Sequence, residues 1–172
     1  MFQDLFQDLY NPILKGGMTM EKKWTIGLAI GGVLCCMVGV VNATTYNPTS
    51  DFSINNGNPN GVWSYGWMPT DFSTFILYTG SQMNYSSPQW YREPASGDYT
   101  PMIWRVDDSY SRNGVAVGQL SLHPSSTYEA SVLRWTAQSN GLYDFIGQFF
   151  SGDGGTMQVG VRQGSDWLWQ GV

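Results

Sequence analysis

The stretch Met157-Gln158-Val159-Gly160-Val161-Arg162 alternates apolar residues with others, and this alternation decides the fold class. A period of two places one set of side chains on a buried face of a strand and the other set on a wet face. Residues 131–137 and 102–106 repeat the pattern, with Arg134 and Arg105 between apolar neighbours. We therefore expect these three stretches to be central strands.

The rest of the chain also has the pattern of an all-β protein. Turn residues recur about every 8–12 positions, a spacing typical of a sandwich or barrel. We expect a further strand over residues 142–150, with most of its aromatic side chains on one face. Between residues 115 and 122 the apolar positions change phase, and a bulge near Gly118 would reconcile them. The prediction is an antiparallel β-sandwich.

The longest expected loop spans residues 80–98. Its periodicity is weak, but it contains Tyr85, Trp90 and Tyr91. Long loops on a protein surface often bind ligands. Shorter loops are expected at residues 55–60, 107–114, 123–127 and 151–155.

A secretory signal is predicted over residues 20–43. Lys22 and Lys23 precede an apolar run, which ends in the small-residue site Val41-Asn42-Ala43. The alternative is an uncleaved membrane span, because the run is close to the minimum length of about 17 residues. No basic cluster follows to stop transfer. We expect residues 1–19 to be a start-site extension and residues 44–172 to be one exported domain.

Composition after residue 43 narrows the class of protein. This part contains no lysine and no cysteine, which leaves no disulfide and no cysteine metal site. Ten acidic residues against five arginines give it a net charge of −5. An acidic surface repels phosphate backbones, so nucleic acid is excluded as a partner.

Five motifs resemble, in order, an exported bacterial domain found in proteins that often end in a PEP-CTERM sorting tail. The motifs are Asp51-Phe52-Ser53, Asn58-Pro59-Asn60-Gly61-Val62-Trp63-Ser64-Tyr65-Gly66, Leu120-Ser121-Leu122-His123-Pro124, Ser131-Val132-Leu133-Arg134-Trp135-Thr136-Ala137 and Gly141-Leu142-Tyr143. The resemblance implies a jelly-roll-like β-sandwich in an extracellular or exopolysaccharide setting, without an established catalytic activity. The sorting tail is absent here, and such domains continue beyond the position of Trp169, so closing strands could be missing.

Enzymatic chemistry has little support in the sequence. His123 is the only histidine, and no nucleophile elbow surrounds a serine. One histidine without cysteine cannot build a zinc site. We expect the His123 ring to hydrogen-bond backbone in a turn and the protein to be non-catalytic, with a hydrolase as the remaining alternative.

Loop carboxylates could instead bind calcium. Asp98, Asp107, Asp108 and Asp153 lie in or beside expected loops, and hard cations favour carboxylate and carbonyl oxygens. No EF-hand spacing is present. Calcium is therefore the one cofactor that the sequence suggests. The alternative for Asp107 and Asp108 is that they simply begin a loop.

Aromatic residues are the main indication of a ligand. The chain has eight tryptophans and ten tyrosines, and all but Trp24 and Tyr10 follow residue 43. A single core cannot absorb all of them, and exposed rings suit the apolar faces of sugars. The candidate glycan-binding residues are Tyr85, Trp90, Tyr91, Trp167 and Trp169. The last two, spaced by two, should share a strand face, where they either complete the core or lie exposed.

Two further residues are expected to serve the fold. Trp63 should anchor the core. Arg134 should stack on an aromatic ring or pair with a carboxylate, with substrate recognition as the alternative.

These observations predict a non-catalytic exported module that is associated with polysaccharide or extracellular matrix and binds glycan. The alternative is a structural surface protein. It would self-assemble, or bind another extracellular protein, by adding a strand to an unpaired edge at the C-terminal end.

Overall fold

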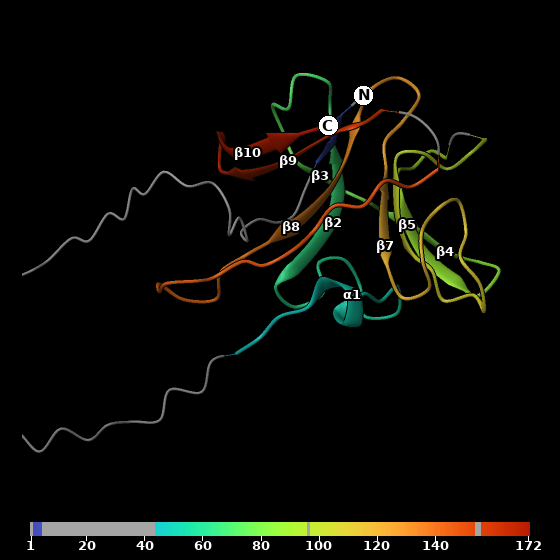
Figure 1. Cartoon of the computed structure of the whole chain (residues 1–172), viewed down its shortest axis with the longest axis horizontal. Coiled ribbons are helices and arrows are strands. Elements are labelled where there is room, and N and C mark those ends of the chain that lie inside the picture. The colour runs from blue at the N-terminus through green and yellow to red at the C-terminus, as the bar shows by residue number, and fades with distance from the viewer. Residues whose placement is uncertain (1, 5–43, 96, 154–155) are drawn as a thin grey trace, which may run out of the picture. The chain divides into compact units, whose positions relative to one another are not determined.

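The computed structural model describes residues 2–4, 44–95, 97–153 and 156–172 (Figure 1). Residues 2–4 and 47–172 belong to one compact unit. The predicted signal at residues 20–43 lies outside the described residues. Within them, no helix has the length and hydrophobicity needed to cross a bilayer.

The described residues form three sheets and one short helix, α1 (Pro48–Asp51). The four-stranded sheet has the order β4 (Gly80–Asn84), β5 (Ser87–Tyr91), β6 (Met102–Arg105) and β7 (Leu120–His123). The second sheet has the order β3 (Ile76–Leu77), β2 (Trp63–Met68) and β8 (Ala130–Trp135). The third has the order β1 (Phe2–Asp4), β9 (Gln158–Gln163) and β10 (Asp166–Gly171). Only β1, on β9, is paired in parallel within this described part.

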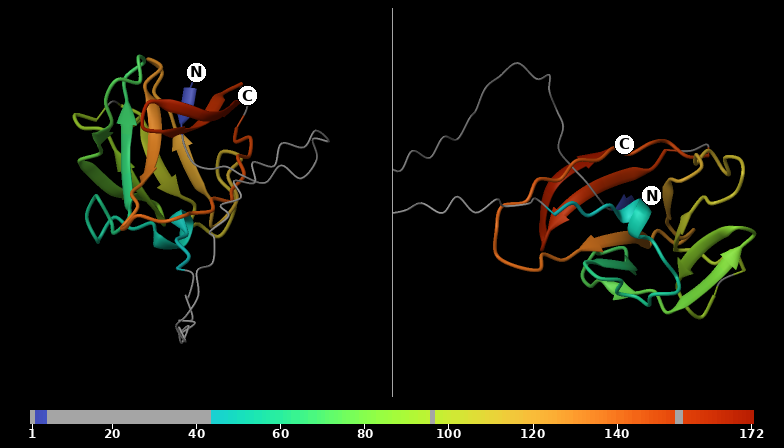
Figure 2. Two further views of the ribbon diagram at one scale, coloured as in Figure 1. Left: turned by 90° about the vertical axis from the view of Figure 1, so that its left-hand side faces the viewer. Right: turned by 90° about the horizontal axis from the view of Figure 1, so that it is seen from below.

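The two faces of β8 show how the layers are arranged. On one face, Ser131 Oγ donates a hydrogen bond to the Met102 carbonyl of β6, at 2.8 Å. Val132, its neighbour and therefore on the opposite face, packs with Ala130 against Met68, Phe72 and Phe75. The β9–β10 hairpin lies over this second face (Figure 2). The all-β sandwich is confirmed, whereas the jelly-roll strand order stays a prediction.

The core is built from aromatic residues. Trp63, Trp90 and Trp104 are buried, and Tyr65 and Tyr78 are completely so. Trp63 Nε1 donates to the Asp51 carboxylate at 3.0 Å, which confirms Trp63 as a core anchor.

The turn motif at residues 58–61 is tied to this core through Asn58. Its side-chain amide donates to the carbonyls of Tyr65 and Tyr78, at 2.6 and 2.9 Å, and its oxygen accepts from the Tyr65 N–H at 2.9 Å. One side chain therefore links β2 to the chain that follows β3.

Three expected strands and the bulge are confirmed, but the central position expected of residues 131–137 is wrong, because β8 is an edge strand of its sheet within the described residues. Residues 157–162, 131–137 and 102–106 correspond to β9, β8 and β6. Near Gly118, the Val106 carbonyl accepts from the Gly118 N–H at 2.7 Å, while the Val106 N–H donates to the Gln119 carbonyl at 3.0 Å. Gly118 and Gln119 therefore lie opposite the single residue Val106, which is the arrangement of a β-bulge. Gly118 takes the left-handed conformation, with φ 81°.

Two expectations are wrong. Residues 80–98 are not one long loop, because β4 and β5 form a hairpin across Tyr85-Ser86. Tyr85 has φ 56°, a conformation in which a hairpin sequence usually has Asn or Gly, so the turn lacked its usual signal. Residues 142–150 form no strand. The rings of Tyr143, Phe145 and Phe149 contact tryptophan rings instead of joining a ladder.

Candidate functional site

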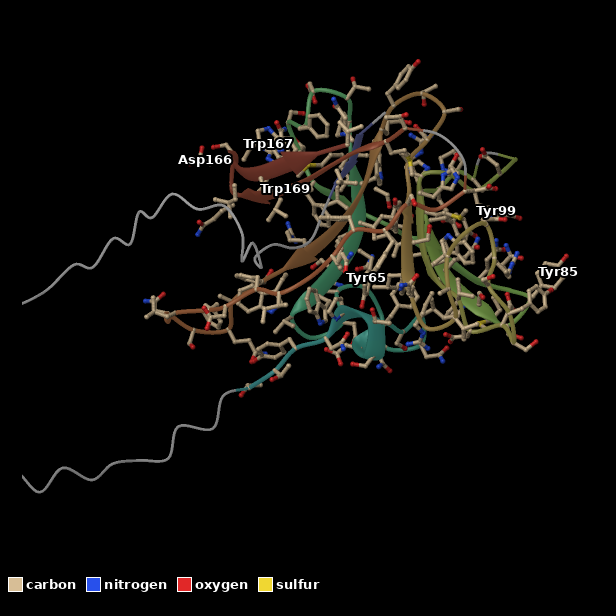
Figure 3. All side chains as sticks on the ribbon, viewed as in Figure 1. Tyr65, Tyr85, Tyr99, Asp166, Trp167 and Trp169 are labelled. Carbon is tan, nitrogen blue, oxygen red and sulfur yellow. The ribbon has the colours of Figure 1, made fainter. Side chains whose placement is uncertain are left out.

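The five predicted glycan-binding residues do not form one platform; Figure 3 labels three of them. Trp90 and Tyr91 are neighbours on β5 and point to opposite faces. Trp90 is buried and donates from Nε1 to the Ser53 carbonyl at 2.9 Å, so its expected exposure is wrong. Tyr91 contacts Tyr99 edge-on, with ring centroids 5.0 Å apart. Tyr85, at the hairpin tip, is exposed and lies over a guanidinium.

Trp167 and Trp169 do not share a strand face. Trp167 pairs with Arg162 and Trp169 with Val161, because a bulge lies between the two tryptophans. Adjacent β9 partners point to opposite faces, so the extra residue places the rings on opposite sides of the hairpin. Both rings are partly exposed, and Trp169 stacks on Phe149 with centroids 5.7 Å apart.

The four candidate calcium ligands are not gathered. No group of three or more Asp, Glu, His or Cys side chains in the described residues could hold a metal ion. Asp107 pairs with Arg105 at 2.6 Å, and Asp98 accepts from the Thr100 hydroxyl. Asp108 likewise has partners of its own. The prediction that Asp98, Asp107, Asp108 and Asp153 together form a calcium site is therefore wrong.

Asp108 is held by a network within the four-stranded sheet and its loops. Burial alone would raise its pKa, but hydrogen bonds from the Ser86 N–H, Arg112 and Ser87 outweigh burial and hold the pKa below its usual range. This carboxylate is a structural residue. His123 Nδ1 donates to the Pro124 carbonyl at 2.7 Å, which confirms the expected turn histidine.

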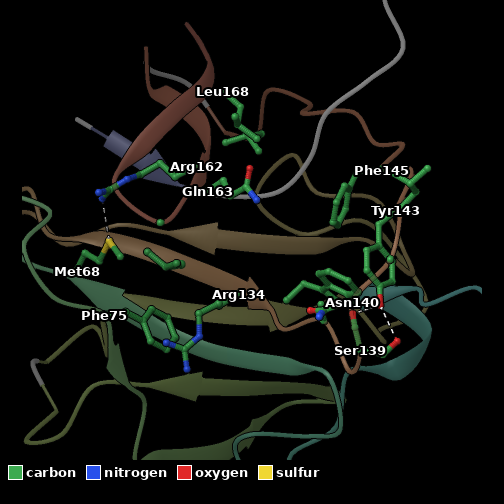
Figure 4. Close-up of a pocket in the computed structure, with 17 residues that line it drawn as sticks. Met68, Phe75, Arg134, Ser139, Asn140, Tyr143, Phe145, Arg162, Gln163 and Leu168 are labelled. Atoms are coloured by element: carbon green, nitrogen blue, oxygen red, sulfur yellow. Dashed lines mark hydrogen bonds between the residues drawn. The ribbon is translucent and has the colours of Figure 1, made fainter. Parts of the chain in front are cut away.

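A groove of about 930 Å³ lies on the outer face of β8, between that strand and the β9–β10 hairpin (Figure 4). Its lining is Met68, Phe75, Val132, Arg134, Trp135, Ala137, Ser139, Asn140, Gly141, Leu142, Tyr143, Phe145, Val161, Arg162, Gln163, Gly164 and Leu168. The five residues predicted to bind glycan are not among them. This volume is within the range of about 300–1,000 Å³ that is usual for ligand sites.

Aromatic rings form one end of the groove. Trp135, at the end of β8, meets Tyr143 edge-on at 4.7 Å and Phe145 at 5.1 Å between centroids. The Tyr143 hydroxyl donates to the Ser139 carbonyl at 2.7 Å, which fixes the ring (Figure 4). Asn140 and Gln163 bring amide groups to the same groove. Apolar rings beside polar groups suit a ligand with both kinds of surface.

The arginines divide into two groups. Arg92, Arg105 and Arg112 form ion pairs with Glu129, Asp107 and Asp108. Arg134 and Arg162 line the groove and have no carboxylate partner within the described residues.

These two guanidiniums are held by aromatic contacts. That of Arg134 lies 4.1 Å from the centre of the Phe75 ring, which confirms the expected stacking. That of Arg162 lies 5.0 Å from the centre of a Trp167 ring and donates from Nη1 to the Phe72 carbonyl at 3.1 Å. Its Nε is buried without a partner in the described part of the chain.

Sequence reasoning missed the groove as a site. It placed Tyr143 and Phe145 on a core strand and gave Arg162 no role. Arg134 has one local signal, because no acidic residue lies within four positions of it, whereas Arg105 pairs with Asp107 two positions away. Arg162 lacks this signal, since Asp166 is near in sequence.

No family model, curated protein or solved structure matches this chain. The resemblance to the exported bacterial domain stays a prediction, and a function has to be inferred from the groove.

Proposed function

We propose that this chain is a non-catalytic exported module that binds polysaccharide in the groove between β8 and the β9–β10 hairpin. The observation that carries the proposal is the cluster of Trp135, Tyr143 and Phe145 beside the amides of Asn140 and Gln163. Sugar rings offer apolar faces to aromatic side chains and hydroxyl edges to amides. The predicted signal and the lysine- and cysteine-free composition that follows it support export.

Affinity electrophoresis tests this proposal. The chain is expressed in full, and its migration is compared in gels with no polysaccharide, with dextran and with alginate. We expect retardation by at least one polysaccharide. Unchanged migration in both gels would overturn the proposal.

A tyrosine pair locates the binding site. Tyr143→Ala removes a ring that lines the groove, and Tyr85→Ala removes an exposed ring outside it. We expect Tyr143→Ala to weaken binding about threefold to tenfold, as the loss of one aromatic contact would. Tyr85→Ala should leave binding unchanged. The reverse result would move the site to the β4–β5 hairpin.

A second candidate function is self-assembly. Leu142, Ile146 and Phe150 are exposed, and within the described residues β10 pairs only with β9, which leaves its outer edge open. An open strand edge can accept a strand from another copy, and exposed apolar side chains can add contacts between copies. Sedimentation velocity at increasing concentration tests this candidate. A growing mass that is indifferent to polysaccharide would favour assembly over binding.

A further inference from the structure

We infer that the groove selects an anionic polysaccharide, with the acidic groups of the glycan placed on Arg134 and Arg162. This inference rests on the proposed glycan binding and names the ligand class. Its basis is the placement of charge, which is independent of the aromatic cluster.

Ion pairs are unevenly distributed among the arginines. Every arginine outside the groove that the structure describes is neutralised by a carboxylate, as the pairs of Arg92, Arg105 and Arg112 show. The acidic residues after residue 43 outnumber the arginines two to one. Two arginines without an acidic partner in such a surface point to a partner supplied from outside.

The Arg162 guanidinium is only partly hydrogen-bonded. Among the described residues only Nη1 has hydrogen-bond acceptors, namely the Phe72 carbonyl at 3.1 Å and the Met68 sulfur at 3.6 Å. Nε is buried and has none. A buried donor without an acceptor is costly. An anion cannot reach the buried Nε, but Nη2 has no acceptor within the described residues and is not among the buried donors, so an anion that binds Nη2 would offset part of the cost of holding this charge in the groove.

Arg134 and Arg162 reach the groove from two different strands. Arg134 is on β8 and Arg162 is on β9, so the two charges approach the groove from different sheets. Both guanidiniums lie over aromatic rings, which limits their rotation and prepares their planar donors for an acidic group. A glycan with acidic groups on successive sugars could bind both while its rings contact the aromatic end.

Charge complementarity also explains selectivity. With a net charge of −5, the protein surface repels polyanions in general. Only a chain whose acidic groups reach the two arginines gains from the encounter. A neutral glycan would bind the aromatic end alone.

The experiment compares dextran, alginate and dextran sulfate as neutral, carboxylated and sulfated probes, with the full chain in affinity electrophoresis. We expect alginate to bind at least about tenfold more tightly than dextran, which is the effect of one charge-assisted contact. This preference should shrink as salt is raised from 0.05 to about 0.5 M, because salt screens exposed charges. Dextran sulfate separates a carboxylate site, which prefers alginate, from a general anion site, which binds both.

Variants assign the preference to the two arginines. Arg134→Gln and Arg162→Gln should each weaken alginate binding about tenfold, reduce its salt dependence, and change dextran binding by less than about twofold. Arg105→Gln changes the net charge by the same amount, but Arg105 lies outside the groove. This variant should therefore leave alginate binding and dextran binding unchanged. Arg134 is exposed, so Arg134→Gln should fold even if Arg162→Gln does not.

Two failures are distinguishable. Equal binding of dextran and alginate, unaffected by Arg134→Gln, would overturn the inference and leave the proposed glycan binding intact. No binding to either dextran or alginate would overturn both.

Discussion

Trp63, Trp90 and Trp104 expose at most 6% of their surface, whereas Trp167 and Trp169 expose 36% and 45%. The first three belong to residues 52–135, here called the packed part, and the last two to residues 136–172, here called the open part. Charge divides the chain almost in the same way, because Arg92, Arg105 and Arg112 of the packed part are paired, whereas Arg162 of the open part and Arg134, at the end of the packed part, are not paired with any described carboxylate. The comparison indicates that the packed part provides stability and that the open part, together with Arg134 beside it, leaves groups available to a partner.

The largest expected effect comes from removing one tryptophan in each part. Trp90→Ala should lower the free energy of unfolding by about 3–5 kcal/mol, because it leaves a large cavity and an unpartnered Ser53 carbonyl. Trp169→Ala should cost about 1 kcal/mol, the value of its stacking on Phe149. Urea unfolding monitored by fluorescence measures both. Equal losses would show that the β9–β10 hairpin belongs to the same core and would break the comparison.

Two glycines give the next largest difference. A Cβ on Gly66 would lie 2.2 Å from the Ile76 carbonyl oxygen, so Gly66→Ala must move β3 and should cost about 2–3 kcal/mol. A Cβ on Gly160 would lie 2.7 Å from an atom of the partly exposed Trp167 ring. That ring can rotate away, and the Trp169 carbonyl oxygen, 3.1 Å from the Cβ, needs to move by only a few tenths of an ångström, so Gly160→Ala should cost about 1 kcal/mol, less than Gly66→Ala. Thermal unfolding of the two variants provides the test, and a larger loss for Gly160→Ala would contradict it.

A carboxylate in each part tests the role of charge. Burial alone would raise the pKa of Glu129, but hydrogen bonds from Ser125, Thr127 and Arg92 outweigh it and hold the pKa below its usual range. A lowered pKa in the folded state stabilises the protein above the unfolded pKa of about 4.3, and this stability is lost as the pH falls through the folded value. Glu129→Gln should cost about 1–3 kcal/mol at pH 7.

The control for Glu129→Gln is Asp144→Asn, which removes the same charge from an exposed residue of the open part. We expect it to change stability by less than about 0.5 kcal/mol. Urea unfolding between pH 7 and pH 3 should show a smaller loss of stability on acidification for Glu129→Gln than for the unaltered protein. An identical pH dependence in the two proteins would show that Glu129 contributes nothing to it.

Two strands of the packed part could be predicted from the sequence, because apolar residues alternate with others along them. The alternation around Trp104 and Leu133 identified β6 and β8, although residues on both faces of each strand are buried, as Ile103 and Val132 show. The β4–β5 hairpin could not be predicted in the same way. Tyr85 adopts a positive φ in the turn, and its ring contacts the Arg112 guanidinium. No local sequence rule favours tyrosine in this conformation.

The open part was harder to predict because local spacing does not determine its side-chain directions. Trp167 and Trp169 are two apart, yet one extra residue at the bulge separates their faces. The groove itself joins β8 to β9, which are far apart in the sequence, so Arg134 could be recognised by itself, but its proximity to Arg162 could not.

The smallest effect on stability is expected from the exposed apolar residues of the open part. Leu142→Ser and Ile146→Ser should each change the free energy of unfolding by less than about 0.5 kcal/mol, because both side chains are already in solvent. If these residues mediate assembly, the same changes should reduce the mass that sedimentation detects at high concentration. Val132→Ser, in the cluster beneath the groove, is the matched change of a buried residue and should destabilise the fold. A loss of stability in Leu142→Ser comparable to that in Val132→Ser would mean that the open part is packed. An unchanged mass of the Leu142→Ser and Ile146→Ser variants in sedimentation would mean that these residues do not mediate assembly, which would leave glycan binding as the role of this surface.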